Sequence, residues 1–138
     1  MSVFIDTSAF LAILNAKDKQ HHDATIAWEH LIASRETLIS SNYVVVETVT
    51  LLQRRFGIDV AQSFQENVYP ILEVEWVDKS IHHAGIATVF TASRRRLSLV
   101  DCVSFEVMRR QGITRAFCFD AHFAEQGFEC IPAKSNAS

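Results

Sequence analysis

The sequence predicts an α/β fold, a three-layer α/β/α sandwich with a mostly parallel central sheet. Short apolar segments with strand propensity alternate with longer helical segments, and this alternation implies right-handed crossovers between parallel strands. Apolar residues make up 49% of the 138 residues, while glycine and proline are scarce, so one core can form and no linker divides it. We therefore expect a single domain over residues 1–132, followed by a flexible C-terminal tail over residues 133–138.

The first half of the chain alternates strand and helix. Its predicted elements are a strand over residues 3–5, helical segments over 8–34, a strand over 37–40 and a helix over 42–57. Ser41 and Asn42 offer a cap for the last of these, and Gly57 ends it. The valine run at residues 44–46 favours a strand by propensity. About sixteen residues without a turn signal are too long for a typical strand, so length favours a helix.

The second half follows the same plan. Its predicted elements are a helix over residues 58–69, a strand over 71–77, a helix from Asp78 to the arginine run 94–96, a helix over 99–111, a strand over 116–119, a short helical turn and a strand over 128–131. In the first of these strands Glu73 and Glu75 alternate onto one face, which indicates a position near the edge of the sheet.

Composition narrows the class of protein. The longest apolar runs are far shorter than the roughly 20 residues of a membrane span, and the N-terminus lacks the features of a signal peptide, so we expect a cytoplasmic protein without membrane association. Cys102, Cys118 and Cys130 show no Cys-x-x-Cys spacing and are interpreted as small buried hydrophobic residues. The net charge of −3 argues against a global attraction to nucleic acid, which would have to be bound locally.

Four acidic residues stand where apolar residues would serve the core better. Asp6 and Asp120 each follow a predicted buried strand, at the sheet edge where open α/β folds bind ligands. Glu47 and Asp101 interrupt apolar stretches. If the four converge, neighbours about 4 Å apart repel by roughly 4 kcal/mol at an effective dielectric constant near 20. A divalent cation would relieve this repulsion, and ligation by oxygen alone favours Mg²⁺ or Mn²⁺.

A cation held in this way would support phosphodiester hydrolysis by a metal-activated water, without a covalent enzyme intermediate. Each acid also has a purely structural interpretation. Asp6 and Asp120 are potential helix caps, Asp101 is a potential partner of Ser98 in a capping box, and Glu47 is a potential solvated helical position. We favour convergence, because two acids at strand ends and two within apolar stretches are an unusual combination in one small α/β chain.

Three short motifs and one helix carry a resemblance to a known family. They are Phe4-Ile5-Asp6-Thr7-Ser8-Ala9, Leu97-Ser98-Leu99-Val100-Asp101, Phe119-Asp120-Ala121-His122-Phe123 and the helix around Glu47. Together they resemble the PIN domain, particularly the stand-alone VapC-type toxins, over nearly the whole chain. The resemblance implies a metal-dependent endoribonuclease in which Asp6, Glu47, Asp101 and Asp120 form the catalytic, metal-binding quartet and Ser8 supports the site. It also implies a homodimer and, for a toxin, an antitoxin partner that keeps it inactive.

Some residues near these motifs leave alternatives open. His122 stands where many relatives carry a second Asp, and an imidazole there could bind Mn²⁺ or Zn²⁺ or contact the scissile phosphate, although we favour a supporting hydrogen bond. Arg94, Arg95 and Arg96 could bind RNA phosphates, or could simply be a solvated helix end.

Two other classes of function compete with the ribonuclease. One is a catalytically inactive PIN-like module that binds RNA or protein, which weak metal affinity and unchanged RNA would identify. The other is a phosphohydrolase with Asp6 as nucleophile, or a phosphorylated receiver domain. Both of these need a suitably placed lysine, and none of the four lysines directly follows a predicted strand.

Overall fold

Five parallel strands form one sheet in the computed structural model, which describes residues 1–133. The strands are β1 (Ser2–Ile5), β2 (Thr37–Ser41), β3 (Glu73–Glu75), β4 (Arg115–Phe117) and β5 (Glu129–Ile131), in the spatial order β3-β2-β1-β4-β5. The predicted parallel sheet is thereby confirmed, as is the edge position of the strand with Glu73 and Glu75. Most of the predicted C-terminal tail, residues 134–138, lies outside the described residues.

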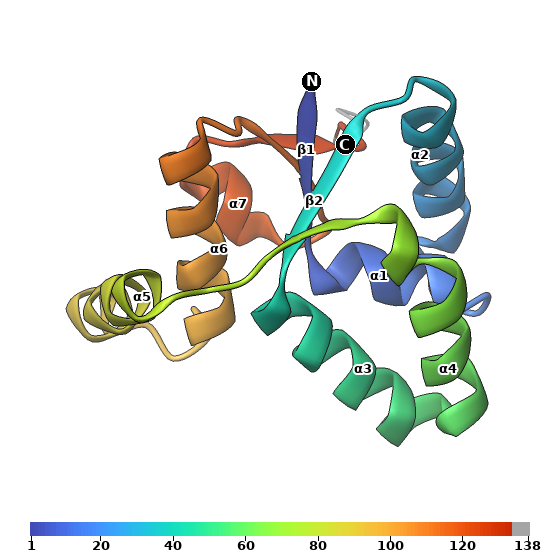
Figure 1. Ribbon diagram of the computed structural model, residues 1–138, viewed down its shortest axis with the longest axis horizontal. Coiled ribbons are helices and arrows are strands. Elements are labelled where there is room, and N and C mark those ends of the chain that lie inside the picture. Colours follow the sequence, from blue (N-terminus) through green and yellow to red (C-terminus); the bar gives the residue numbers. More distant parts are fainter. Residues whose placement is uncertain (134–138) are drawn as a thin grey trace.

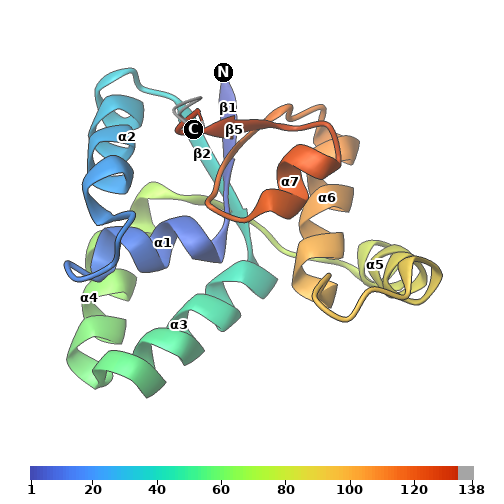
Figure 2. The same ribbon diagram turned by 180° about the vertical axis from the view of Figure 1, so that it is seen from behind.

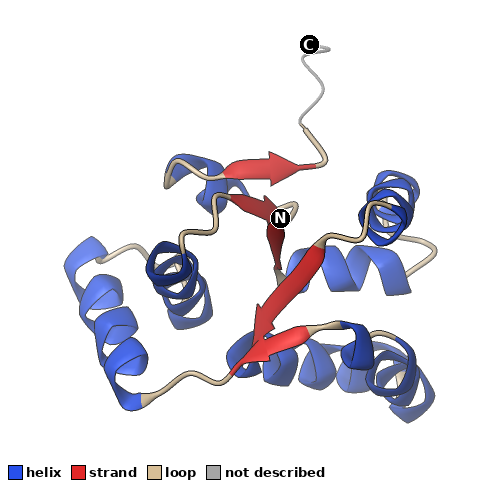
Figure 3. Cartoon of the chain, turned by 45° about the horizontal axis from the view of Figure 1, so that its top comes forward, coloured by secondary structure: helices blue, strands red, loops and turns tan. Residues whose placement is uncertain are grey.

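Helices cover both faces of the sheet (Figures 1 and 2). The helices on one side are α1 (Thr7–Leu14), α2 (His21–Ala33), α3 (Asn42–Phe56) and α4 (Ile58–Asn67), and those on the other are α5 (Lys79–Ala92), α6 (Leu99–Gln111) and α7 (Ala121–Glu125). The chain leaves β1 in one direction to form β2 and β3, and then crosses back to form β4 and β5 (Figure 3). The strand order therefore reverses between β1 and β4, which is where α/β sheets bind ligands.

Residues 42–56 form helix α3, as the length of the segment predicted, in spite of the strand propensity of its valine run. The Ser41 side chain caps it by accepting a hydrogen bond from the Val44 amide at 3.2 Å, and Gly57 ends it with a φ of 95°. Its buried residues, Val44, Thr48 and Leu52, recur every four positions, so one face of the helix packs on the core. Burial of this face stabilises a helix in spite of the β-branched residues.

The core on the other face depends on a close approach between α5 and α6. Gly85 of α5 is buried, and a Cβ added there would lie 2.6 Å from Cγ2 of Val103 in α6. The absence of a side chain at Gly85 thus allows the two helices to touch. Because α6 begins next to the carboxyl ends of the strands, this contact helps to fix the position of its first turn.

Several predicted boundaries differ from the structure. Helices α1 and α2 are separated by residues 15–20, and α5 ends at Ala92 because Ser93 adopts a left-handed conformation (φ 51°). Strand β4 ends at Phe117, and α4 ends at Asn67 before a 3₁₀ turn. The expectation that all three cysteines are buried was wrong for Cys130, which is only half-buried. No helix within residues 1–133 has both the length and the apolar character needed to cross a bilayer.

Candidate metal centre

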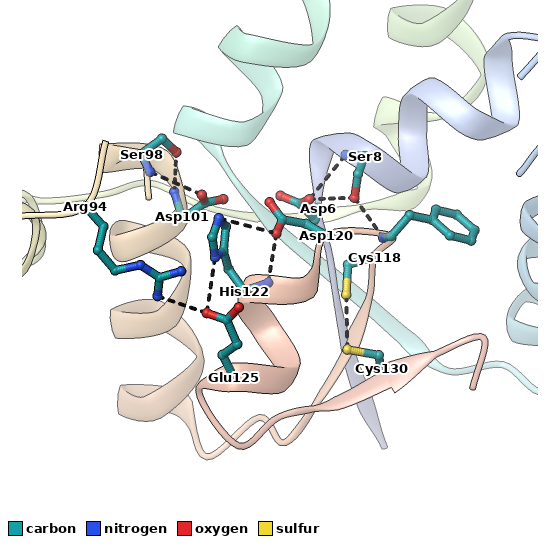
Figure 4. A network of polar contacts seen from close by, with 11 residues as sticks. Asp6, Ser8, Arg94, Ser98, Asp101, Cys118, Asp120, His122, Glu125 and Cys130 are labelled. Carbon is teal, nitrogen blue, oxygen red and sulfur yellow. Dashed lines mark hydrogen bonds and ion pairs between the residues drawn. The ribbon is translucent and has the colours of Figure 1, made fainter. Parts of the chain in front are cut away.

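The carboxylates of Asp6, Asp101 and Asp120 gather at the edge where β1 and β4 end (Figure 4). Asp6 directly follows β1, and its backbone amide donates a 3.1 Å hydrogen bond to the Phe117 carbonyl at the end of β4. Asp120 follows β4 after two further residues, and Asp101 lies in the first turn of α6. The structure thus brings three of the four predicted acids to one edge of the sheet, although the group of potential ligand atoms that lie within 4.8 Å of one another contains Asp101 and Asp120 and not Asp6.

Asp6 is held in place by the helix that it caps. Its Oδ2 accepts hydrogen bonds from the Ser8 amide at 3.2 Å and from the Ser8 hydroxyl at 2.7 Å. Oγ of Ser8 in turn accepts a hydrogen bond from the Phe119 amide at 2.9 Å. Ser8 therefore connects the segment after β1 to the segment after β4, and so links the chain positions of Asp6 and Asp120.

Local caps orient the other two carboxylates as well. Oδ2 of Asp101 accepts from the Ser98 amide at 3.2 Å, while Oγ of Ser98 accepts from the Asp101 amide at 3.0 Å, which completes the capping box. Oδ1 of Asp120 accepts from the His122 amide at 2.8 Å. The predicted structural roles of these acids are therefore real, but each cap uses only one oxygen. Within residues 1–133, the second oxygen of each carboxylate has no protein hydrogen bond.

Burial makes the negative charge of this cluster costly. Asp6 is 4% exposed, and its pKa is raised from 3.8 to about 7, first by burial and then by the charges of Asp101 and Asp120, against the opposing effect of the Ser8 hydrogen bonds. Burial also raises the pKa of Asp101, and the charge of Asp120 adds to that increase. Several carboxylates in a poorly solvated site favour either protonation or a bound cation.

His122 lies on the outer side of the carboxylate cluster, close to both Asp101 and Asp120. One potential ligand atom each from Asp101, Asp120 and His122 lie within 4.8 Å of one another. Nε2 of His122 is 3.8 Å from Oδ1 of Asp120, and Nδ1 is 3.4 Å from Oε2 of Glu125. The same Glu125 oxygen forms a 2.9 Å ion pair with Arg94. Sequence reasoning did not find Glu125, although its spacing of three from His122 on a helix was a usable signal.

Glu47, the fourth predicted acid, lies apart from this group. Its side chain is half-buried on α3, and it has no hydrogen bond or ion pair within residues 1–133. It lines a surface cavity of about 330 Å³ together with Tyr43, Val46 and Val100. Because Val100 precedes Asp101, Glu47 faces the first turn of α6 without contributing to the cluster itself.

Two further cavities adjoin the carboxylates and meet at Phe119. One, of about 300 Å³, is lined by Asp120, Gln20 and Asp23, among others. The other, of about 310 Å³, is lined by residues from the start of α1, the loop before α2 and the end of α3, including Ser8, Lys19, Arg55 and Phe56. A ligand that extends past the carboxylates therefore has space on both sides of Phe119.

The residues present fit a divalent cation. The acids offer three oriented oxygens without protein partners, one of them on the deeply buried Asp6, and hard oxygen donors suit Mg²⁺ and Mn²⁺. The site also carries the excess negative charge that such a cation would neutralise. The arrangement can therefore hold a cation next to two cavities of about 300 and 310 Å³.

Comparison with known sequences agrees with this geometry. The PIN domain family model matches residues 3–129. Two relatives from Mycobacterium tuberculosis, of the strains CDC 1551 / Oshkosh and H37Rv, are named 23S rRNA-specific endonuclease VapC20. Each is 35% identical to this chain over 128 residues, which cover 91% of this chain and 95% of the relative.

Comparison with solved structures confirms the predicted PIN-like fold. The crystal structure of VapC20 from Mycobacterium tuberculosis, described as a sarcin-ricin loop cleaving toxin, matches with a TM-score of 0.78 and 35% identity, over 92% of this chain and 96% of that chain. FitAcB from Neisseria gonorrhoeae matches with a TM-score of 0.68 over 93% of this chain and 95% of that chain. At 11% identity, the second match shows a common fold alone.

Proposed function

The chain belongs to the PIN-domain family, and from that premise we propose that it is a divalent-metal-dependent endoribonuclease, which hydrolyses RNA phosphodiester bonds. The observation that carries the proposal is the set of three carboxylates at the ends of β1 and β4, each oriented by its own cap and each with one oxygen left for a ligand. The likeness to an endonuclease over 91% of the chain supports the same activity.

Asp6, Asp101 and Asp120 would hold Mg²⁺ or Mn²⁺ directly, and Glu47 would act from the facing side of α3. When bound, the cation would lower the pKa of a water molecule and stabilise the charge that develops on the phosphate. The protein orients the carboxylates in advance. Ser8 donates a hydrogen bond to one oxygen of Asp6, and Ser98 donates one to an oxygen of Asp101, so the second oxygen of each acid is left for the cation. Such preorganisation reduces the rearrangement needed when the substrate binds.

The RNA strand would cross the edge of the sheet along the two cavities that meet at Phe119. Lys19 and Arg55 line one of them and have no ion pair within residues 1–133, so they are available to phosphate oxygens. Arg95 and Arg96, which were predicted to bind RNA, are exposed and stay candidates. Arg94 differs because Glu125 already neutralises it.

The relatives suggest a substrate and a setting. Because they are named for cleavage of 23S rRNA, we propose a structured ribosomal RNA as the first substrate to test, and a role as the toxin of a cytoplasmic toxin–antitoxin pair. We also propose a homodimer and an inhibitory antitoxin. Trp76, at 68% exposed, and Phe90, at 75% exposed, are apolar side chains that such partners could bury.

Cleavage of fluorescent RNA tests the proposed activity. The panel contains a 23S rRNA stem-loop and unstructured strands, incubated with Mg²⁺, Mn²⁺ or EDTA. Wild type is compared with Asp6→Asn and Asp101→Asn, and Asp59→Asn on the exposed side of α4 serves as the matched control. We expect metal-dependent cleavage that only the control variant retains. Intact RNA with wild type, or equal cleavage by all four proteins, would instead support the inactive RNA- or protein-binding module.

A further inference from the structure

We propose that His122 is a nitrogen ligand of the metal in this site, oriented by Glu125 and Arg94, and that it gives the site a preference for Mn²⁺ over Mg²⁺. The inference rests on the proposed metal centre of the three aspartates. It assigns to this chain a ligand set of mixed oxygen and nitrogen, in place of carboxylates alone.

The position of His122 fits a ligand. Its side chain is 15% exposed, and Nε2 points to the carboxylate group, 3.8 Å from Oδ1 of Asp120 (Figure 4). Ligands that share one cation with bond lengths near 2.1 Å lie roughly 3 to 4 Å apart. The separations within the group of Asp101, Asp120 and His122, all within 4.8 Å, permit such sharing after small side-chain adjustments.

The hydrogen bonds of His122 leave the correct nitrogen free. A carboxylate can only accept, so Nδ1 of His122 donates its proton to Oε2 of Glu125 at 3.4 Å. In the neutral ring Nε2 then carries a lone pair and no proton. Its distance of 3.8 Å from Asp120 is too long for a hydrogen bond, so Nε2 is not engaged by that carboxylate.

Arg94 completes the arrangement from the loop between α5 and α6. Nη1 of Arg94 donates to Oε2 of Glu125 at 2.9 Å, which holds this carboxylate on the Nδ1 side of the ring. A carboxylate that accepts the outer proton of a metal-binding histidine fixes its tautomer and makes it a better donor. Arg94, Glu125 and His122 thus form a chain of contacts that ends at the carboxylates.

The nitrogen donor bears on the choice of cation. Imidazole suits the transition metals, whereas Mg²⁺ prefers oxygen ligands and keeps several waters. A neutral histidine also adds less negative charge than a further aspartate would. The site should therefore bind Mn²⁺ more tightly than Mg²⁺, and the difference should depend on His122.

Pulsed electron paramagnetic resonance of bound Mn²⁺ tests the ligand directly and needs no RNA. The full chain is loaded with Mn²⁺, and the ¹⁴N hyperfine coupling is compared among wild type, His122→Gln and the control His30→Gln, which changes an exposed histidine of α2. We expect nitrogen coupling in wild type and in the control, and its loss in His122→Gln. Bound Mn²⁺ without nitrogen coupling in wild type, or coupling that persists in His122→Gln, overturns the inference but leaves the proposed metal centre intact.

Calorimetric titration with Mn²⁺ and Mg²⁺ gives a second, independent measurement. Glu125→Gln, which changes the outer partner of the ligand, should weaken Mn²⁺ binding about 10- to 100-fold and keep the nitrogen coupling, while His122→Gln should weaken Mn²⁺ binding at least as much and Mg²⁺ binding much less. Thermal unfolding confirms that each variant is folded. Equal losses for both cations in His122→Gln overturn the inference, and wild type that binds neither cation refutes the proposed metal centre together with it.

Discussion

The end of β1 and the facing side of α3 each carry an acid of the predicted quartet, in very different surroundings. Asp6, at the end of β1, is 4% exposed, accepts two hydrogen bonds from Ser8 and has a pKa raised to about 7. Glu47, on α3, is half-buried and has no polar contact within residues 1–133. The Asp6 carboxylate is fixed by the amide and the hydroxyl of Ser8, whereas the Glu47 side chain can still change rotamer. The acids of the predicted quartet should therefore contribute unequally to metal binding and cleavage.

The largest expected effect is the loss of cleavage in Asp101→Asn, which belongs to the fixed group with Asp6. The variant removes one negative charge from the cluster, and we expect kcat to fall by about a thousandfold or more, equivalent to roughly 4 kcal/mol. An asparagine Oδ1 can still accept from the Ser98 amide, so the capping box and the fold should survive. Single-turnover cleavage with saturating Mn²⁺ measures the rate, and more than about a tenth of wild-type activity would exclude Asp101 as a metal ligand.

The same comparison shows how much of the site the sequence could predict. Asp6 and Asp120 were placed correctly because a residue that follows a buried parallel strand can lie only at the carboxyl edge of the sheet. Asp101 was predicted because it interrupts an apolar stretch, and the capping box with Ser98 places it in the first turn of α6. For these acids capping is compatible with the proposed metal-binding role, because a carboxylate has two oxygens and the cap uses one.

The remaining parts depended on tertiary structure. Glu47 lies at the flank of the buried stripe of α3, three residues after Val44, so its exposure depends on how closely α6 packs beside it. The pair of Arg94 and Glu125 joins residues 31 positions apart, and it forms only because the loop before α6 lies beside α7. The end of α5 at Ala92 likewise depends on the left-handed conformation of Ser93, which its residue type does not indicate.

The pH dependence of the metal-free protein's stability should reveal that the buried negative charge of Asp6 is unfavourable. Its pKa is about 7 in the folded protein and near the ordinary 3.8 when unfolded, so the folded state binds the proton more tightly. The free energy of unfolding should thus fall as pH rises from about 4 to 7, by up to about 4 kcal/mol at 1.36 kcal/mol for each pKa unit. Urea unfolding in EDTA at pH 5 and pH 8 measures the larger part of this loss, since the first part occurs below pH 5.

Asp6→Asn provides the control for that measurement. The variant should unfold with a much smaller pH dependence and be more stable than wild type at pH 8 without metal, because no buried charge forms at this position. Mn²⁺ should stabilise wild type at pH 8 and leave the variant nearly unchanged. A wild-type protein whose stability rises between pH 5 and pH 8 in EDTA would show that Asp6 is not the buried, repelled carboxylate described here.

Ser8→Ala should give a smaller effect in the same region. The change removes the hydroxyl that donates to Asp6 and leaves the Phe119 amide without its acceptor, so we expect a loss of about 1 to 2 kcal/mol in stability. The pKa of Asp6 should rise further, since the Ser8 hydrogen bond lowers it. Ser40→Ala is the matched control, because its buried hydroxyl donates to the Ile5 carbonyl and, within residues 1–133, forms no hydrogen bond with a carboxylate. If both variants lose the same stability and show the same pH dependence, Ser8 does not act on Asp6.

Glu47→Gln should give the smallest effect and is the strongest test of the contrast with Asp6. Because the half-exposed side chain of Glu47 has no polar contact among residues 1–133, it can reach the cation only by changing rotamer or through a water. We therefore expect kcat to fall about 10-fold, or roughly 1.4 kcal/mol, with little change in stability. Glu66→Gln, on the exposed end of α4, is the control for a lost carboxylate. A loss as large as that of Asp101→Asn would mean that Glu47 moves into the cluster when metal binds, and the two regions would then differ only in the metal-free protein. Calorimetric Mn²⁺ binding to Glu47→Gln decides between these cases, because a direct ligand changes the affinity and a water-mediated one changes mainly the rate.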